Sequence, residues 1–180
     1  MKRHLMIAGM IVIWVTALAA CNPNEPEAST SCPTPQSGTT LLTYEAQGYC
    51  LLYPETHQPV EVSEAETVFV VGDLMNVSEP RVSVNVTDAA GESTTDAAGR
   101  ILAVFGLPDS NPPGAVTMGG MEAVVLDNMP GQDINRRVIM VHNDRLYDLT
   151  FLPIGPDYGD VGQRTEELYQ LVIDSFTFTP

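Results

Sequence analysis

Alternation of apolar and polar residues marks β-strands in the part of the chain that follows residue 40. It is strictest from Arg81 to Thr87, where valines occupy every second position and Ser83 and Asn85 lie between them. Successive side chains of a strand point to opposite faces, so this segment predicts a strand with one buried and one wetted face. A β-branched and aromatic run at 67–71 predicts a second strand, buried on both faces.

Short turns between apolar runs predict two hairpins. One joins residues 41–44 to 49–53, and the other joins residues 137–142 to 145–152. Asn143 and Asp144 form the second turn, and both residue types tolerate the positive φ angles of a two-residue hairpin. The pair Gly119-Gly120 predicts a tight turn or a bulge between two strand pieces within 112–128, and 176–178 predicts a last short strand.

Helical spacing of apolar residues appears twice. Ser93 and Asp96 resemble a capping box in front of an apolar series that ends at Gly106. A second helix is predicted from Gln163 to Ser175, after a loop rich in glycine and aspartate.

Strands in neighbouring antiparallel hairpins, with one helix in the middle and one at the end, predict an α+β domain over residues 41–180. The segment 137–148 carries apolar residues on both faces. We therefore expect an antiparallel β-sheet flanked by helices on both sides.

The first 20 residues have the pattern of a secretion signal. Lys2 and Arg3 precede an apolar run of thirteen residues at 5–17, which is shorter than the ~20 residues that span a bilayer. A transmembrane anchor is the alternative, but no basic residue directly follows the run to stop transfer. The string Leu18-Ala19-Ala20-Cys21 resembles the lipobox of bacterial lipoproteins. The resemblance implies cleavage before Cys21, so residues 1–20 form a lipoprotein signal peptide.

The same resemblance implies that Cys21 carries a thioether-linked diacylglycerol and an acylated α-amino group, with palmitate or similar chains. Two or more chains anchor a protein stably, since each buried methylene contributes about 0.8 kcal/mol. The expected location is the extracytoplasmic face of the cell membrane. A buried or disulfide-bonded Cys21 is the alternative.

The chain is strongly acidic. Loss of the leader removes Lys2 and Arg3 and changes the formal net charge from −15 to −17, and no lysine remains. Such a surface repels nucleic acid and anionic lipids, so neither is an expected partner and membrane attachment must depend on lipid at Cys21.

Residues 21–40 predict a flexible lipidated tether, because prolines, polar residues and glycine dominate and no apolar periodicity is present. Cys32 and Cys50 are the two remaining cysteines. An exported protein meets oxidising conditions, which favours a disulfide between them. The alternative is a buried thiol at Cys50 and a free one at Cys32.

Two segments of the domain have a distinctive order of residues. Residues 48–54 read Gly-Tyr-Cys-Leu-Leu-Tyr-Pro, and residues 145–151 with 168–178 predict a strand, a helix and a Ser-Phe-x-Phe end. These segments resemble the opening and the close of PsbP-like and DcrB-like domains. The resemblance implies an α/β/α sandwich and an accessory or binding role in the cell envelope. The chain departs from this pattern at 55–59, where such domains often have Gly-Trp.

Motifs for catalysis are missing from the sequence. It has no Gly-x-Ser-x-Gly, His-Glu-x-x-His, phosphate-binding loop or Cys-x-x-Cys. His57 is expected in a loop and His142 at a solvated hairpin turn. The acidic segments 127–133 and 157–160 lack EF-hand spacing, and Asp160 is expected to cap a helix. We therefore predict no catalytic residue, no metal and no cofactor.

The favoured interpretation is a non-enzymatic, lipid-anchored accessory or binding protein of the bacterial cell envelope, with a protein partner or small ligand. A structural envelope protein without a discrete ligand is the first alternative. An enzyme whose site is assembled from dispersed Asp, Glu and Tyr residues is the second.

Overall fold

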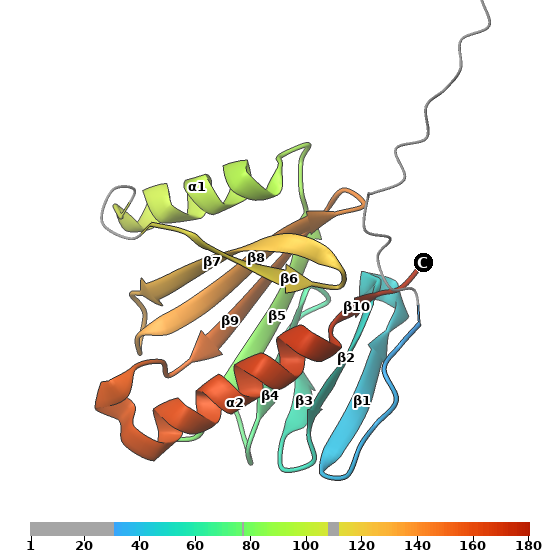
Figure 1. The fold of residues 1–180 in the computed structure, drawn as a ribbon, viewed down its shortest axis with the longest axis vertical. Helices are drawn as coiled ribbons and strands as arrows, with labels where there is room; N and C mark the ends of the chain where they lie inside the picture. The colour runs from blue at the N-terminus through green and yellow to red at the C-terminus, as the bar shows by residue number, and fades with distance from the viewer. Residues whose placement is uncertain (1–30, 77, 108–111) are drawn as a thin grey trace, which may run out of the picture.

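The computed structural model describes residues 31–76, 78–107 and 112–180. It contains a seven-stranded antiparallel sheet, a three-stranded antiparallel sheet and two α-helices (Figure 1). In chain order the elements are β1 (Thr39–Tyr44), the 3-10 helix η1 (Glu45–Gln47), β2 (Tyr49–Pro54), β3 (Gln58–Glu61), β4 (Glu66–Val70), β5 (Arg81–Asp88), α1 (Thr94–Phe105), β6 (Gly114–Met118), β7 (Met121–Met129), β8 (Asn135–His142), β9 (Arg145–Leu152), the 3-10 helix η2 (Pro156–Tyr158), α2 (Gly159–Ser175) and β10 (Thr177–Phe178).

The two helices cover opposite faces of the large sheet, whose strand order is β3-β4-β5-β9-β8-β7-β6. Alternation along β8 shows this directly, because Val138 and Met140 belong to the core beneath α2 and Ile139 belongs to the core beneath α1. The small sheet, β1-β2-β10, contributes Tyr49 and Leu51 to the α2 side. The predicted α+β class with helices on both faces is confirmed.

Most predicted hairpins and turns are present. Strands β1 and β2 pair from Thr39↔Pro54 to Tyr44↔Tyr49, and β8 pairs with β9 across Asn143 and Asp144, whose φ angles are 48° and 58°. Gly119 and Gly120, at φ 59° and 82°, turn β6 into β7. A side chain at Gly119 would also place its Cβ 2.5 Å from the ring of Phe178, so only glycine fits.

Helix α1 begins and ends as the sequence predicts. The Ser93 hydroxyl accepts a hydrogen bond from the Asp96 backbone N–H at 3.2 Å and donates one to the Asp96 carboxylate at 2.7 Å. Gly106 ends the helix in the left-handed conformation. Ala97, Ala98, Ile101 and Leu102 are buried against β7 and β8.

Helix α2 differs from the prediction at its start. It begins at Gly159, four residues earlier than expected, directly after η2. Asp160 therefore lies in the first turn instead of capping the helix. Strand β3 was not predicted: it lies at the edge of the large sheet, pairs only with β4 and contains Pro59.

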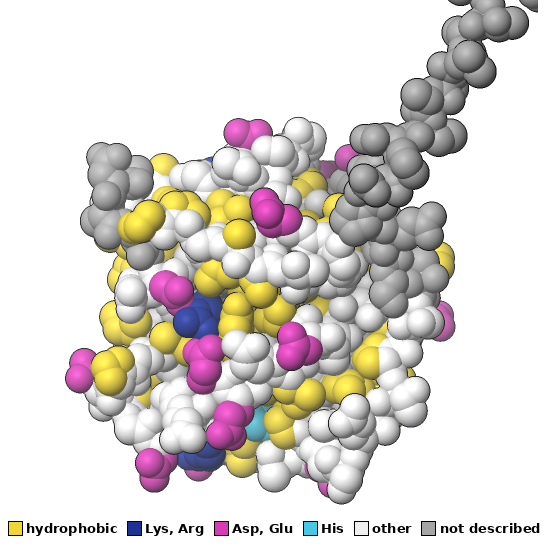
Figure 2. Space-filling model, viewed as in Figure 1, with side chains coloured by type: hydrophobic (Ala, Val, Ile, Leu, Met, Phe, Trp, Pro, Cys, Tyr) yellow, Lys and Arg dark blue, Asp and Glu magenta, His cyan; other side chains and the backbone are white. Residues whose placement is uncertain are grey.

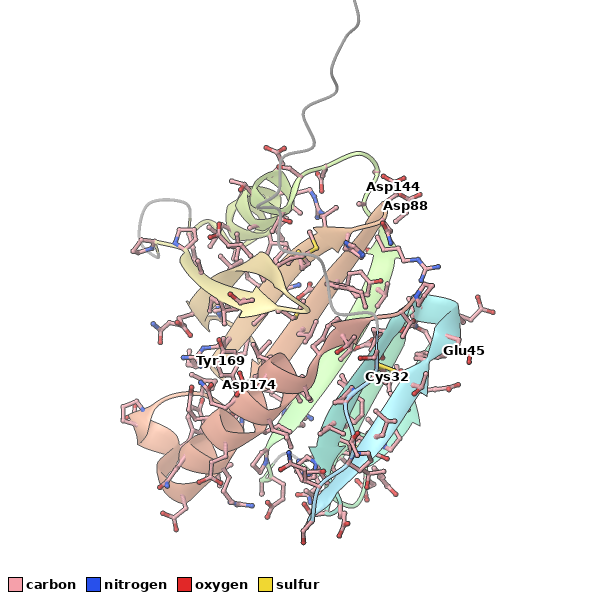
Figure 3. All side chains as sticks on the ribbon, turned by 45° about the vertical axis from the view of Figure 1, so that its right-hand side comes forward. Cys32, Glu45, Asp88, Asp144, Tyr169 and Asp174 are labelled. Carbon is pink, nitrogen blue, oxygen red and sulfur yellow. A yellow bond between two sulfur atoms is a disulfide. The ribbon has the colours of Figure 1, made fainter. Side chains whose placement is uncertain are left out.

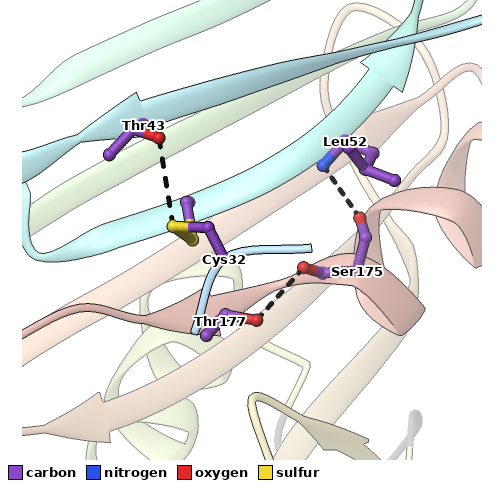
Figure 4. Close-up of a disulfide and its surroundings, with 6 residues drawn as sticks. Cys32, Thr43, Leu52, Ser175 and Thr177 are labelled. Atoms are coloured by element: carbon purple, nitrogen blue, oxygen red, sulfur yellow. Dashed lines mark hydrogen bonds between the residues drawn. A yellow bond between two sulfur atoms is a disulfide. The ribbon is translucent and has the colours of Figure 1, made fainter. Parts of the chain in front are cut away.

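Cys32 and Cys50 form a disulfide, with their Cα atoms 5.8 Å apart (Figure 4). Cys50 is fully buried in β2, so the bond ties the chain before β1 to the centre of the small sheet. Beside it, the Leu52 backbone N–H donates to the Ser175 hydroxyl at 3.0 Å and joins β2 to the end of α2. The disulfide prediction is confirmed.

Candidate functional site

A groove lies between α2 and the ends of β2 and β5. Its cavity volume is about 400 Å³, which is within the usual range of ligand sites. We call it the His57 groove; its lining residues are Pro54, Thr56, His57, Val71, Glu79, Pro80, Arg164, Glu167, Leu168 and Leu171.

Three segments that are distant in sequence build this groove. Pro54 ends β2 and residues 55–57 follow it, residues 71–80 connect β4 to β5, and residues 164–171 belong to α2. Positions three, four and seven apart on a helix share one side, so α2 directs Arg164, Leu168 and Leu171 toward the other two segments. Its walls are mainly apolar, and charged groups lie among them.

His57 is held by hydrogen bonds on both ring nitrogens. Nε2 lies 3.1 Å from the Pro80 carbonyl oxygen, which can only accept, so Nε2 donates. Nδ1 lies 3.1 Å from the Thr56 hydroxyl, which donates to the neutral ring. Burial lowers the pKa of His57, although Pro80 and Glu79 act in the opposite direction. The ring is therefore fixed in place and favours its neutral form.

The charges of the groove are only partly paired. Arg164 forms an ion pair with Glu79. Glu167 is exposed and has no ion-pair partner among the residues that the structure describes. The groove thus combines an apolar floor with a free carboxylate at its rim.

His142 does not approach His57, because it ends β8 on a different part of the fold. Its ring lies 4.2 Å from that of Phe178, and burial lowers its pKa. His142 lies beside the hairpin turn as predicted, but its ring is only partly exposed because Phe178 of β10 packs against it. The two histidines are not brought together as a catalytic pair.

Asp127, in the first acidic segment, has a structural partner in Arg136. Asp127 accepts from Arg136 Nε at 2.5 Å, and Glu166 of α2 accepts from the same guanidinium at 2.7 Å. Arg136 also lies 4.4 Å above the ring of Tyr169. These contacts fasten α2 to the sheet. Within residues 31–76, 78–107 and 112–180, no group of three His, Cys, Asp or Glu side chains is arranged to hold a metal ion.

A larger hollow of about 490 Å³ lies between η1, the β3–β4 connection and the β8–β9 turn. Asp88 and Asp144 lie side by side at its rim (Figure 3). Its rim consists largely of exposed polar residues in turns. The His57 groove is the better candidate because apolar residues from a helix and two strand ends form its walls.

The sequence did not predict this groove, although His57 was expected in a loop. The one residue that could have indicated the groove is Leu171. It fits the helical spacing of apolar residues but is only half-buried in the structure. Cys21, the predicted lipidation site, lies outside the described residues. No described helix has the length and apolarity needed to cross a bilayer.

Several solved structures share the fold, among them the following two. Cyanobacterial PsbP from Synechocystis sp. PCC 6803 is 17% identical with a TM-score of 0.54, over 82% of this chain and 97% of that one. A protein from Bacteroides thetaiotaomicron is 12% identical with a TM-score of 0.54, over 79% of this chain and 49% of that one. No family model matches the chain, and no curated protein does.

The chain therefore has the α+β fold of the PsbP-like structures. Identities this low establish the architecture alone.

Proposed function

We propose that this chain is a lipid-anchored accessory protein of the bacterial cell envelope, held at the extracytoplasmic face of the membrane by lipid on Cys21. The observation that carries the proposal is the lipobox-like Leu18-Ala19-Ala20-Cys21 behind a basic start and a short apolar run. The Cys32–Cys50 disulfide agrees with an oxidising compartment.

The domain acts by binding, not by catalysis, and the His57 groove is its binding site. The groove has the volume of a ligand site, but both nitrogens of His57 are already engaged and Arg164 is paired with Glu79. This arrangement offers shape, apolar surface and charge to a partner. The similarity to PsbP supports an accessory role by analogy of fold.

Substitution of Cys21 tests the anchor. Cys21→Ser removes the thiol that would carry the diacylglycerol, so the protein should move from the membrane fraction to the soluble fraction and lose incorporation of labelled palmitate. Immunoblots of fractionated cells measure the first effect and metabolic labelling measures the second.

Cys32→Ser is the matched control, because it removes a different cysteine and should leave the protein on the membrane. Retention of the Cys21→Ser protein on membranes would overturn the proposal.

A further inference from the structure

The outer side of α2 carries carboxylates at a regular interval. Asp160, Glu167 and Asp174 are seven residues apart, and all three are exposed. Seven residues advance an α-helix by about 10.5 Å and nearly two full turns, so the three side chains form one line along α2. None of them has an ion-pair partner in the part of the chain that the structure describes.

One of these carboxylates destabilises its own helix. Asp174 lies in the last turn of α2, which has no basic residue. The C-terminal end of a helix carries a partial negative charge and disfavours a carboxylate. Asp174 therefore has no favourable electrostatic role within the folded domain. A cationic group of a binding partner would offset its unfavourable interaction with the helix end.

Apolar surface lies beside this acidic line. The His57 groove borders Glu167 with the half-buried Leu171. Figure 2 shows this side of the molecule, with hydrophobic side chains exposed between acidic ones. An occupant of the surface must match both kinds of group.

We propose that α2 and the His57 groove bind a basic amphipathic helix of a protein partner. Lysine or arginine side chains about 10 Å apart on that helix pair with Asp160, Glu167 and Asp174. An apolar side chain of the same helix enters the groove against Leu171. This inference rests on the proposed binding role of the groove and names the chemistry of its partner.

Charge complementarity favours a basic helix as the binding partner. The mature chain has a net charge of −17 and no lysine, so its field attracts a cationic segment and repels an acidic one at long range. Anionic lipid surfaces are repelled in the same way.

A defined peptide tests the proposal on the full-length lipidated protein in non-ionic detergent micelles. The probe is a fluorescein-labelled helix of leucine, alanine and lysine of about 18 residues, with lysines seven residues apart. Fluorescence anisotropy should show binding that weakens as salt rises from about 50 to about 500 mM. One control peptide has glutamate for every lysine, the other serine for every leucine, and both should bind at least about tenfold more weakly.

Matched variants localise the binding. Glu167→Gln should weaken the lysine peptide by about two- to fivefold, and Glu167→Gln with Asp174→Asn by about five- to twentyfold, the range expected for exposed ion pairs. Asp144→Asn removes an exposed carboxylate from the β8–β9 turn, away from α2 (Figure 3), and should bind like the wild type.

The proposal would be overturned if the glutamate peptide or the serine peptide bound as tightly as the lysine peptide. It would also be overturned if the double variant and Asp144→Asn bound the lysine peptide with equal affinity. The Cys21→Ser protein should bind the lysine peptide as the wild type does. Failure of the peptide to bind and failure of the anchor are therefore separate outcomes.

Discussion

His57 connects the stability of the domain to the pH of its surroundings. The folded ring donates from Nε2 to the Pro80 carbonyl and accepts at Nδ1 from Thr56, an arrangement that suits the neutral form. Glu79 favours the charged form and Arg164 opposes it, but burial has the larger effect and the pKa is lowered. The unfolded chain therefore takes up a proton at a higher pH than the folded chain does.

Acidification should consequently remove a stabilising contribution of His57. The contribution is fully present above the unfolded pKa of about 6.5 and is lost as pH falls from there toward the lower folded pKa. His57→Gln lacks this proton uptake. Its free energy of unfolding should fall less than that of the wild type between about pH 7.5 and 5.5, measured by urea denaturation. Parallel curves for the two proteins would contradict the assignment.

Helix α1 shows how a few local residues can determine an element. Its ends were predictable because Ser93 and Gly106 act on the backbone directly beside them. The β8–β9 turn was predictable for the same reason, since Asn143 and Asp144 adopt the positive φ angles that their side chains tolerate.

Loss of the α1 cap should be measurable. Ser93→Ala leaves the Asp96 backbone N–H without its side-chain acceptor, and the free energy of unfolding should fall by about 1 kcal/mol. Thr95→Ala is a suitable control, because Thr95 is exposed in the first turn, and its effect should stay within about 0.5 kcal/mol. If Ser93→Ala and Thr95→Ala lost equal free energy of unfolding in urea denaturation, the Ser93 cap would not stabilise the helix.

Tertiary contacts explain the elements that were not predicted. Strand β3 lacks a clear alternating pattern and contains Pro59, which an edge strand tolerates because one of its sides has no partner strand. Helix α2 begins earlier than predicted, although Gly159 and Gly162 disfavour a helix. A Cβ at Gly162 would lie 2.5 Å from the Gly155 carbonyl oxygen, so glycine allows the helix start to approach that loop.

At the scale of the whole molecule, the disulfide closes a loop between residues separated by 18 positions. It links a segment before β1 to a fully buried strand residue. In the chain-entropy model a loop of this size stabilises the fold by about 3 kcal/mol.

A reductant should therefore lower the free energy of unfolding of the wild type by about 3 kcal/mol. Cys32→Ser should show the same loss without reductant, and reductant should not change it further. Urea denaturation with and without dithiothreitol provides the comparison. A wild type that is insensitive to reductant, with two thiols reactive when denatured, would contradict the bond.

The His57 groove could not be predicted, because it depends on how α2 crosses the ends of two strands. Residues 54–57, 71–80 and 164–171 give no common signal in the sequence. Leu168 and Leu171 repeat at helical spacing, but this spacing does not show that Leu171 remains partly exposed.

The disulfide also determines how far the domain can travel. Only ten residues separate Cys21 from Cys32, and at about 3.5 Å each they reach about 35 Å. With lipid on Cys21, the domain would be confined to a thin layer above the bilayer. A partner anchored in the same membrane would meet it at an effective concentration on the order of millimolar. A contact that is weak between free molecules would then be occupied most of the time.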